Sequence, residues 1–223
     1  MNKDIRVGVL ASGSGTDLQS IIDASEKKII DAKVCVVISD NKDAFALKRA
    51  SNHGIDNYFI DPIGIKKEIH EEKIDKIFKK SNIDLIVGAG YMRILSPNFV
   101  SKWYGRLINI HPALLPSFKG ANGQGDALDY GVKISGCTTH FMDEEMDHGP
   151  IILQAAIKVH KNDDRNKLAN RILKIEHIIL PRTIQLFAEK RLKIKDRKVI
   201  ILPGESWINR VNKNQDVLYS EGF

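Results

Sequence analysis

The 223-residue chain is poor in cysteine and has no apolar run long enough to span a membrane. Its two cysteines, Cys35 and Cys137, each lie in an apolar segment, where a buried thiol is more common than a disulfide or a metal ligand. We therefore expect no metal site and a reducing, cytoplasmic environment. A cleavable signal pattern is also missing before the first apolar run, which starts at Ile5, so nothing indicates secretion or membrane insertion.

Neither sign of charge is in large excess, because 34 basic residues are balanced by 28 acidic ones, for a net charge of +6. This balance suits an anionic small substrate as well as a nucleic acid, so it does not distinguish between these two kinds of partner. Hydrophobic residues make up 43% of the chain, which is enough to build the core of one large α/β domain.

Short apolar runs alternate with longer stretches of helical periodicity in the first part of the chain. The runs occupy 5–10, 33–39, 57–60 and 84–90, and the helical stretches occupy 17–30, 43–53 and 66–81. This alternation predicts a doubly wound α/β fold, with crossover helices packed on a mostly parallel central sheet. Further strands are expected at 106–110, 134–142 and 151–159, before a long helix over 164–192 with a bend preceding Pro181. We expect residues 1–195 to form one domain and 196–223 to add a strand or hairpin and a tail, not a separate domain.

A glycine-rich turn, "ASGSGTDLQ", separates the first predicted strand from the first predicted helix. Backbone amides and the positive end of a helix can hold an anion there. A dinucleotide fingerprint would need a third glycine where Leu18 stands, and a phosphate-binding Walker loop would need a lysine. Two readings remain open: a site for a single phosphate near Gly15, Thr16 and Asp17, or a plain turn with Thr16 or Asp17 as N-cap.

The segment "LINIHPALLPSFKG", residues 107–120, places two polar residues in an apolar strand. Side chains of an extended chain alternate between faces, so Ile108 and Ile110 can enter the core while Asn109 and His111 share the opposite face. In an open α/β sheet, ligands bind at the carboxyl end of such a strand. The alternative is a structural histidine whose hydrogen bonds are satisfied within the core.

An acidic segment, "MDEEMDHGPIILQ", lies between two predicted strands. Asp147 directly precedes the apolar residues, so its carboxylate could be held at the sheet edge and keep a histidine protonated. The alternative is a solvated turn in which the aspartate makes only local hydrogen bonds.

Six separated segments resemble the phosphoribosylglycinamide formyltransferase family, the folate-dependent enzymes of purine biosynthesis. They read "VLASGSGTDLQSIID", "GYMRILSPNFV", "INIHPALLPSFKG", "GCTTHF", "MDHGPIILQ" and "EHIILP", in the family's order. The resemblance covers most of residues 5 to 195 and implies the formyltransferase fold, whose N-terminal half is Rossmann-like. It also implies transfer of the formyl group of 10-formyltetrahydrofolate, a co-substrate, to the amine of glycinamide ribonucleotide in de novo purine biosynthesis.

The resemblance also implies functional residues in this sequence. The family's catalytic trio falls on Asn109, His111 and Asp147, and its ribonucleotide contacts fall on Gly15, Thr16, Asp17 and Glu176. The folate contacts fall on Lys67, Met92, Arg93, Ile94, Leu95, Asn109, Asp143, Glu144, Glu145, Met146 and Asp147. A cis peptide bond before Pro116 is expected from the same likeness. Implied partners are these small molecules, with no nucleic acid, membrane or metal.

Three features depart from the family pattern, and one of them involves two neighbouring residues. Family members usually carry asparagine where this chain has Asp17, and a carboxylate beside a phosphate is repulsive unless another group intervenes. Gln124 replaces a common histidine, and Lys66 and Lys67 stand where many relatives place an arginine near the folate tail. Formyltetrahydrofolate deformylase and methionyl-tRNA formyltransferase share the trio but usually carry an additional domain, so the chain length argues against both. A non-catalytic phosphate-binding module also remains open, and no surface pattern decides between a monomer and a homodimer.

Overall fold

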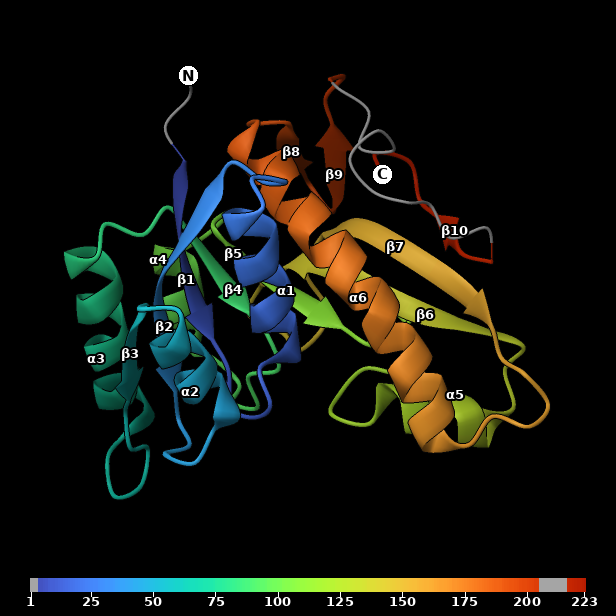
Figure 1. The fold of residues 1–223 in the computed structure, drawn as a ribbon, viewed down its shortest axis with the longest axis horizontal. Coiled ribbons are helices and arrows are strands. Elements are labelled where there is room, and N and C mark those ends of the chain that lie inside the picture. The colour runs from blue at the N-terminus through green and yellow to red at the C-terminus, as the bar shows by residue number, and fades with distance from the viewer. Residues whose placement is uncertain (1–3, 205–215) are drawn as a thin grey trace.

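The computed structural model describes residues 4–204 and 216–223, and these form an eight-stranded central sheet and a separate two-stranded sheet. The central order is β3-β2-β1-β4-β5-β6-β7-β10 (Figure 1). The strand bounds are β1 Ile5–Leu10, β2 Ala32–Ser39, β3 Asp56–Phe59, β4 Leu85–Gly88, β5 Leu107–His111, β6 Ile134–Phe141, β7 Ile151–Lys158 and β10 Leu218–Tyr219. The second sheet is a hairpin of β8 Leu192–Lys195 and β9 Lys198–Ile201.

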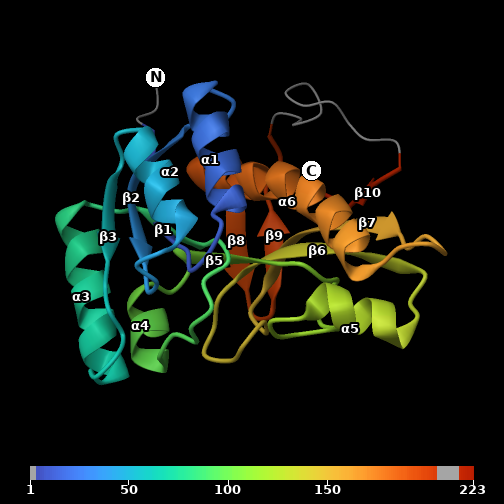
Figure 2. The same ribbon diagram turned by 60° about the horizontal axis from the view of Figure 1, so that its bottom comes forward.

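Helices cover both faces of the central sheet (Figure 2). One face carries α1 Thr16–Glu26, α2 Phe45–Asn52 and α6 Arg165–Ala188, and the other carries α3 Lys67–Lys80 and α4 Pro97–Lys102. A further helix, α5 Gly123–Tyr130, packs against α6. The predicted doubly wound α/β architecture is therefore confirmed. None of the described helices is long and apolar enough to cross a membrane.

The sheet changes direction in its second half. β3, β2, β1, β4 and β5 pair in parallel, whereas β6, β7 and β10 pair antiparallel to their neighbours. The prediction of a mostly parallel sheet holds for the first five strands, where crossover helices connect the strands. The periodicity of the later strands did not predict their antiparallel order, because a buried strand has the same apolar pattern in either direction.

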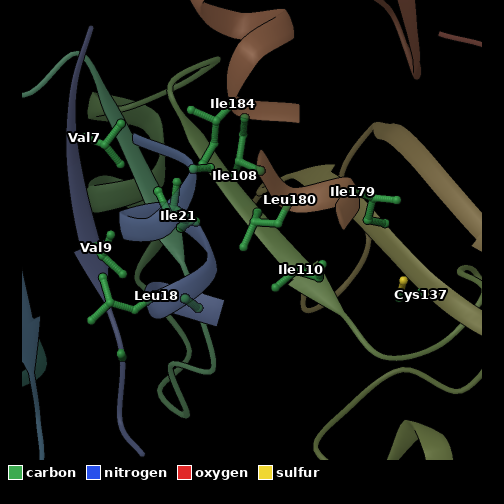
Figure 3. Close-up of a cluster of buried hydrophobic side chains, with 14 of the residues drawn as sticks. Val7, Val9, Leu18, Ile21, Ile108, Ile110, Cys137, Ile179, Leu180 and Ile184 are labelled. Atoms are coloured by element: carbon green, nitrogen blue, oxygen red, sulfur yellow. The ribbon is translucent and has the colours of Figure 1, made fainter. Parts of the chain in front are cut away.

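The core on the α1 and α6 side holds the apolar face of β5 in place. Ile108 and Ile110 are buried there, together with Ile179, Leu180 and Ile184 of α6 (Figure 3). Fully burying one such side chain contributes about 1.5–3 kcal/mol, so this contact fixes which face of β5 is turned away from the core. The alternation predicted for residues 107–111 is thereby confirmed on its apolar side.

The described part of the C-terminal region joins the main domain. β8 and β9 form the hairpin expected after the long helix, and β10 pairs with β7 at the sheet edge. The side chain of Arg182, buried on α6, donates from Nε and Nη2 to the carbonyl of Gly222 at 3.1 and 2.9 Å. The polar tail predicted between these elements includes 205–215, which lie outside the described residues.

Two short helices were not predicted from the sequence, α4 and α5. α4 begins at Pro97 after the N-cap Ser96, whose side chain accepts from the amide of Phe99, and a helix this short gives little periodic signal. α6 continues through Pro181, so the proline does not end the helix. The peptide bond between Leu115 and Pro116 is cis, as expected from the resemblance.

Candidate active site

A cavity of about 350 Å³ lies at the carboxyl ends of β1, β4 and β5. Its lining includes the last residues of these three strands, Leu10, Gly88 and His111. Residues of β6, the loop that follows β6, and α6 also line it. This is the position at which an open α/β sheet binds its ligands.

The pleat of β5 brings both predicted polar residues into this cavity. Asn109 and His111 line it, whereas their neighbours Ile108 and Leu107 are buried in the cores on either side of the sheet. Asn109 also needs a glycine beside it, because a Cβ atom on Gly88 would lie 2.8 Å from the Asn109 Oδ1 atom. The predicted convergence of an imidazole and a carboxamide is confirmed.

His111 is buried and each of its ring nitrogens faces an oxygen atom. Nε2 lies 2.7 Å from the carbonyl oxygen of Phe118, and Nδ1 lies 3.4 Å from Oδ2 of Asp147. A carbonyl oxygen only accepts, so Nε2 carries a proton, and a second proton on Nδ1 would be stabilised by the carboxylate. His111 is therefore held between two oxygen acceptors, one on each ring nitrogen.

Asp147 lies in a turn after β6, in the left-handed region at φ 49°. Its carboxylate is largely buried and accepts a hydrogen bond from the backbone amide of Gly120 at 2.8 Å. This bond ties the 142–149 loop to the segment that follows β5. The prediction that Asp147 faces a histidine is confirmed, and its alternative, a purely local turn contact, is wrong.

A second histidine, His140 of β6, was not predicted to belong to the site. It pairs across the sheet with Asn109, and its Nε2 lies 3.4 Å from the Asn109 Nδ2 atom and 3.8 Å from Oδ1 of Asp147. Its Nδ1 donates to the carbonyl of Phe141 at 2.9 Å. Burial lowers the pKa of His140, so its ring is neutral and its Nε2 lone pair can accept from the Asn109 amide. The sequence contains no direct indication of this residue, because its place in the site depends on the antiparallel register of β5 and β6, which composition does not reveal.

The segment after β4 forms another wall of the cavity. Met92, Arg93, Ile94 and Leu95 all line it, as the resemblance implied. Ser12 holds the start of this segment: its hydroxyl accepts from the amide of Met92 at 2.9 Å and donates to Asp40 at 2.6 Å.

The end of the same segment is held by a buried carboxylate on α3. Glu71 accepts from the amide of Ser96 at 2.7 Å, and its second oxygen accepts from the Ser96 hydroxyl. Both Glu71 and Ser96 are buried, so these bonds are shielded from water. The wall is thus fixed at both ends by polar groups outside the cavity.

The acidic loop forms the opposite wall, and Asp143, Glu144, Glu145, Met146 and Asp147 all line the cavity. Arg197, in the turn between β8 and β9, donates from Nη2 to the carbonyl of His148. Its Nη1 lies 3.2 Å from Nδ1 of His148, which in turn lies 2.8 Å from Oδ2 of Asp143. The C-terminal hairpin therefore holds the base of this loop.

The start of α1 contributes one residue to the cavity. Asp17 lines it together with Glu176 of α6, whereas Thr16 lines a separate groove between α1 and α6. The N-cap of α1 is Gly15, at φ 66° and without a side-chain cap, so the alternative that Thr16 or Asp17 is the N-cap is wrong. A Cβ atom on Gly15 would lie 2.8 Å from Ala46, which explains the glycine there.

Asp17 and Glu176 bring two carboxyl groups into one buried place. Burial raises the pKa of Asp17 to about 6, and burial together with the Asp17 carboxylate raises the pKa of Glu176 well above its usual range. A histidine approaches one of them: Nε2 of His177 lies 3.7 Å from the Asp17 carboxylate, but burial lowers the pKa of that imidazole.

Two further expectations concern residues away from this cluster. Lys67, the first residue of α3, is not among the residues that line the cavity, so its contact with a folate tail stays a prediction. Gln124 of α5 does line it. Within 4–204 and 216–223, no group of three or more His, Cys, Asp or Glu side chains is arranged to hold a metal ion.

The arrangement can stabilise a negative oxygen and accept a proton in the same cavity. The Asn109 amide is a hydrogen-bond donor, a protonated His111 would add a positive charge beside it, and the Asp147 carboxylate is a neighbouring acceptor. Such a set of groups suits acyl transfer, in which an oxyanion forms while a nucleophile loses a proton.

Comparison with known proteins identifies relatives of the whole domain. The model of the formyl transferase family matches residues 5–184. The trifunctional purine biosynthetic protein adenosine-3 of Homo sapiens is 40% identical over 86% of this chain, which spans only 19% of that protein. Phosphoribosylglycinamide formyltransferase of Escherichia coli is 39% identical over 86% of this chain and 91% of its own. The crystal structure of glycinamide ribonucleotide transformylase 1 from Symbiobacterium toebii superposes with a TM-score of 0.89 at 44% identity, covering 91% of this chain and 96% of that one.

Arg197→Ala should loosen the 142–149 loop, because it removes the donor to the His148 carbonyl. Losing one such hydrogen bond costs about 0.5–1.5 kcal/mol, so we expect roughly two- to tenfold faster cleavage after Glu144 or Glu145 by a glutamate-specific protease. Lys195→Ala removes the same charge from the same hairpin and serves as the control. Equal cleavage rates for the two variants would show that the hairpin does not hold the loop.

Asp17→Asn should stabilise the protein at alkaline pH. The folded-state pKa of Asp17 is raised from 3.8 to about 6, so wild-type stability falls as pH rises through this range, whereas the amide carries no charge. We expect the variant to gain on the order of 2–3 kcal/mol at pH 8 and about half of that at pH 5, measured by urea unfolding. Asp23→Asn, on the same helix, is the control; a gain for Asp17→Asn that does not depend on pH would contradict the assignment.

Proposed function

Because the chain belongs to the formyl transferase family, we propose that it transfers the formyl group of 10-formyltetrahydrofolate to the amine of glycinamide ribonucleotide. The observation that carries the proposal is the convergence of Asn109, His111 and Asp147 on one cavity at the carboxyl end of the parallel strands. Two of the relatives described above support the proposal, because one is named phosphoribosylglycinamide formyltransferase and the other glycinamide ribonucleotide transformylase 1. The proposal places the reaction in the cytoplasm, between two small molecules and without a nucleic-acid partner.

In the proposed reaction, the ribonucleotide amine attacks the formyl carbon and forms a new C–N bond. The carbonyl oxygen becomes negative in the tetrahedral intermediate, where the Asn109 amide donates a hydrogen bond to it. The His111 imidazolium, whose N–H groups face Phe118 and Asp147, stabilises the oxygen through its positive charge. The bond between the formyl carbon and N10 of the folate then breaks. The proton lost by the amine passes by way of Asp147 to N10, so that charge and atoms balance.

His140 has a positioning role in this proposal. Its neutral Nε2 accepts from one N–H of Asn109, which sets the orientation of the amide and leaves the second N–H for the oxyanion. Asp147 in turn orients His111 from the Nδ1 side while the Phe118 carbonyl fixes Nε2. These contacts mean that the donors are aimed before any substrate binds, as electrostatic catalysis requires.

The two substrates are assigned to opposite parts of the cavity. The folate is assigned to the walls formed by Met92–Leu95 and Asp143–Asp147, which offer apolar side chains and backbone groups. The ribonucleotide is assigned to the side of Asp17 and Glu176, next to the amides at the start of α1, because a helix N-terminus attracts phosphate. The catalytic trio lies between the two parts. Side chains supply the donors and the proton acceptor, so the proposal includes no metal.

The proposed function is tested by incubating the protein with 10-formyltetrahydrofolate in the presence and absence of glycinamide ribonucleotide. Absorbance of the folate product reports turnover, and we expect turnover only when the ribonucleotide is present, because the amine is the nucleophile. Equal turnover without it would identify a hydrolase. Ligand binding without any turnover would favour the phosphate-binding module.

Asn109→Ala, His111→Ala and Asp147→Ala should each lower kcat strongly without unfolding the protein. Losing one oxyanion donor costs about a hundredfold to a thousandfold in turnover in other enzymes, and we expect losses of this order here. Steady-state kinetics with both substrates saturating gives kcat, and circular dichroism checks the fold. Asn52→Ala, at an exposed position on α2, is the matched control, and near-normal kcat in a folded trio variant would remove that residue from the mechanism.

A further inference from the structure

Two carboxyl groups from different elements meet in the cavity without a strong positive partner. Asp17 comes from the first turn of α1 and Glu176 from the middle of α6, and both line the cavity. Glu176 is only 5% exposed. The Asp17 Oδ1 atom is buried and has no hydrogen-bond partner within the described residues.

The groups around the pair do not neutralise two negative charges. His177 of α6 approaches Asp17 at 3.7 Å, but its Nε2 is buried and unpaired, and burial with the nearby Arg49 lowers its pKa. Cys137 of β6 faces both carboxyls, and burial raises the pKa of its thiol, which stays neutral. Arg49 of α2 directs its Nε to the carbonyl of Ser14 at 2.8 Å and its Nη1 to Gln19.

Two ionised carboxylates in this place would repel each other and any anion beside them. The pKa values of both groups are raised, chiefly by burial, so the pair keeps a proton at a pH where isolated carboxyls have lost theirs. A protonated carboxyl can donate a hydrogen bond to its partner or to a phosphate oxygen, which an ionised one cannot. The pair resembles other carboxyl dyads in that its proton belongs to both groups together.

We infer that Asp17 and Glu176 share one proton and that the phosphate-bearing substrate binds only while the pair holds it. This inference rests on the proposed function, since it concerns the ribonucleotide part of the same cavity. It assigns Asp17 as a specificity-determining residue that makes binding of an anionic substrate depend on pH. The substrate would then bind together with a proton that the pair must retain.

The test is calorimetric binding of glycinamide ribonucleotide to the full chain across about pH 6 to 9, without folate. The apparent Kd of the wild type should rise about tenfold per pH unit once the pair loses its proton, because only the protonated fraction binds. Asp17→Asn abolishes the dyad, so its Kd should change by no more than about threefold over the same pH range. The ligand's own titration, which is common to both proteins, is subtracted first. Asp23→Asn, two turns further along α1, should keep the wild-type slope. Titration in two buffers of different ionisation enthalpy should show about one more proton taken up by the wild type than by Asp17→Asn at high pH.

The outcomes separate this inference from the proposed function. Identical pH slopes and proton counts in wild type and Asp17→Asn would overturn the inference and leave the transferase in place. Turnover of the formyl donor and the ribonucleotide by the wild type, together with a steeper pH dependence of Kd in the wild type than in Asp17→Asn, would support both the proposed function and the inference. A folded wild type that neither binds nor uses the ribonucleotide at any pH would overturn the proposed function and the inference with it.

Discussion

The alternation of side chains along β5 is the constraint on which the site depends. Ile108 and Ile110 are held in the core against α6, so the polar residues between and after them must face the cavity. Moving the strand by a single residue would bury the carboxamide and expose the isoleucines, at a cost of several kcal/mol for the apolar surface alone. The packing of the core therefore sets the direction in which the catalytic groups point.

The antiparallel pairing of β5 with β6 adds the second half of the constraint. It places His140 directly across from Asn109 and makes the loop after β6 return beside His111. In a purely parallel sheet, a crossover helix would have to connect β5 to the next strand. The loop that follows that next strand would then not be placed beside β5 by a direct antiparallel pairing. The switch in strand direction therefore brings residues from two strand ends and one loop into a single small volume.

Much of this could be predicted from the sequence, for identifiable reasons. The alternation of short apolar runs with helical periodicity gave the doubly wound α/β class, and the period of two around Asn109 gave the face it occupies. Contacts that depend on long-range register could not be predicted. His140 joins the site through cross-strand pairing, and Arg197 reaches the 142–149 loop from a hairpin far along the chain. Thr16 follows Gly15 in the sequence but faces another groove, because the first turn of a helix rotates each side chain by about 100° from the last.

The contact between Arg182 and Gly222 bears on the order in which this protein can mature as it leaves the ribosome. A guanidinium is costly to bury, and two of its N–H groups find a carbonyl acceptor that is synthesised 40 residues later in the chain. The α6 helix that carries this arginine also supplies Glu176 and much of the core. The catalytic residues and the whole of α6 are therefore synthesised before the carbonyl that satisfies this buried arginine becomes available.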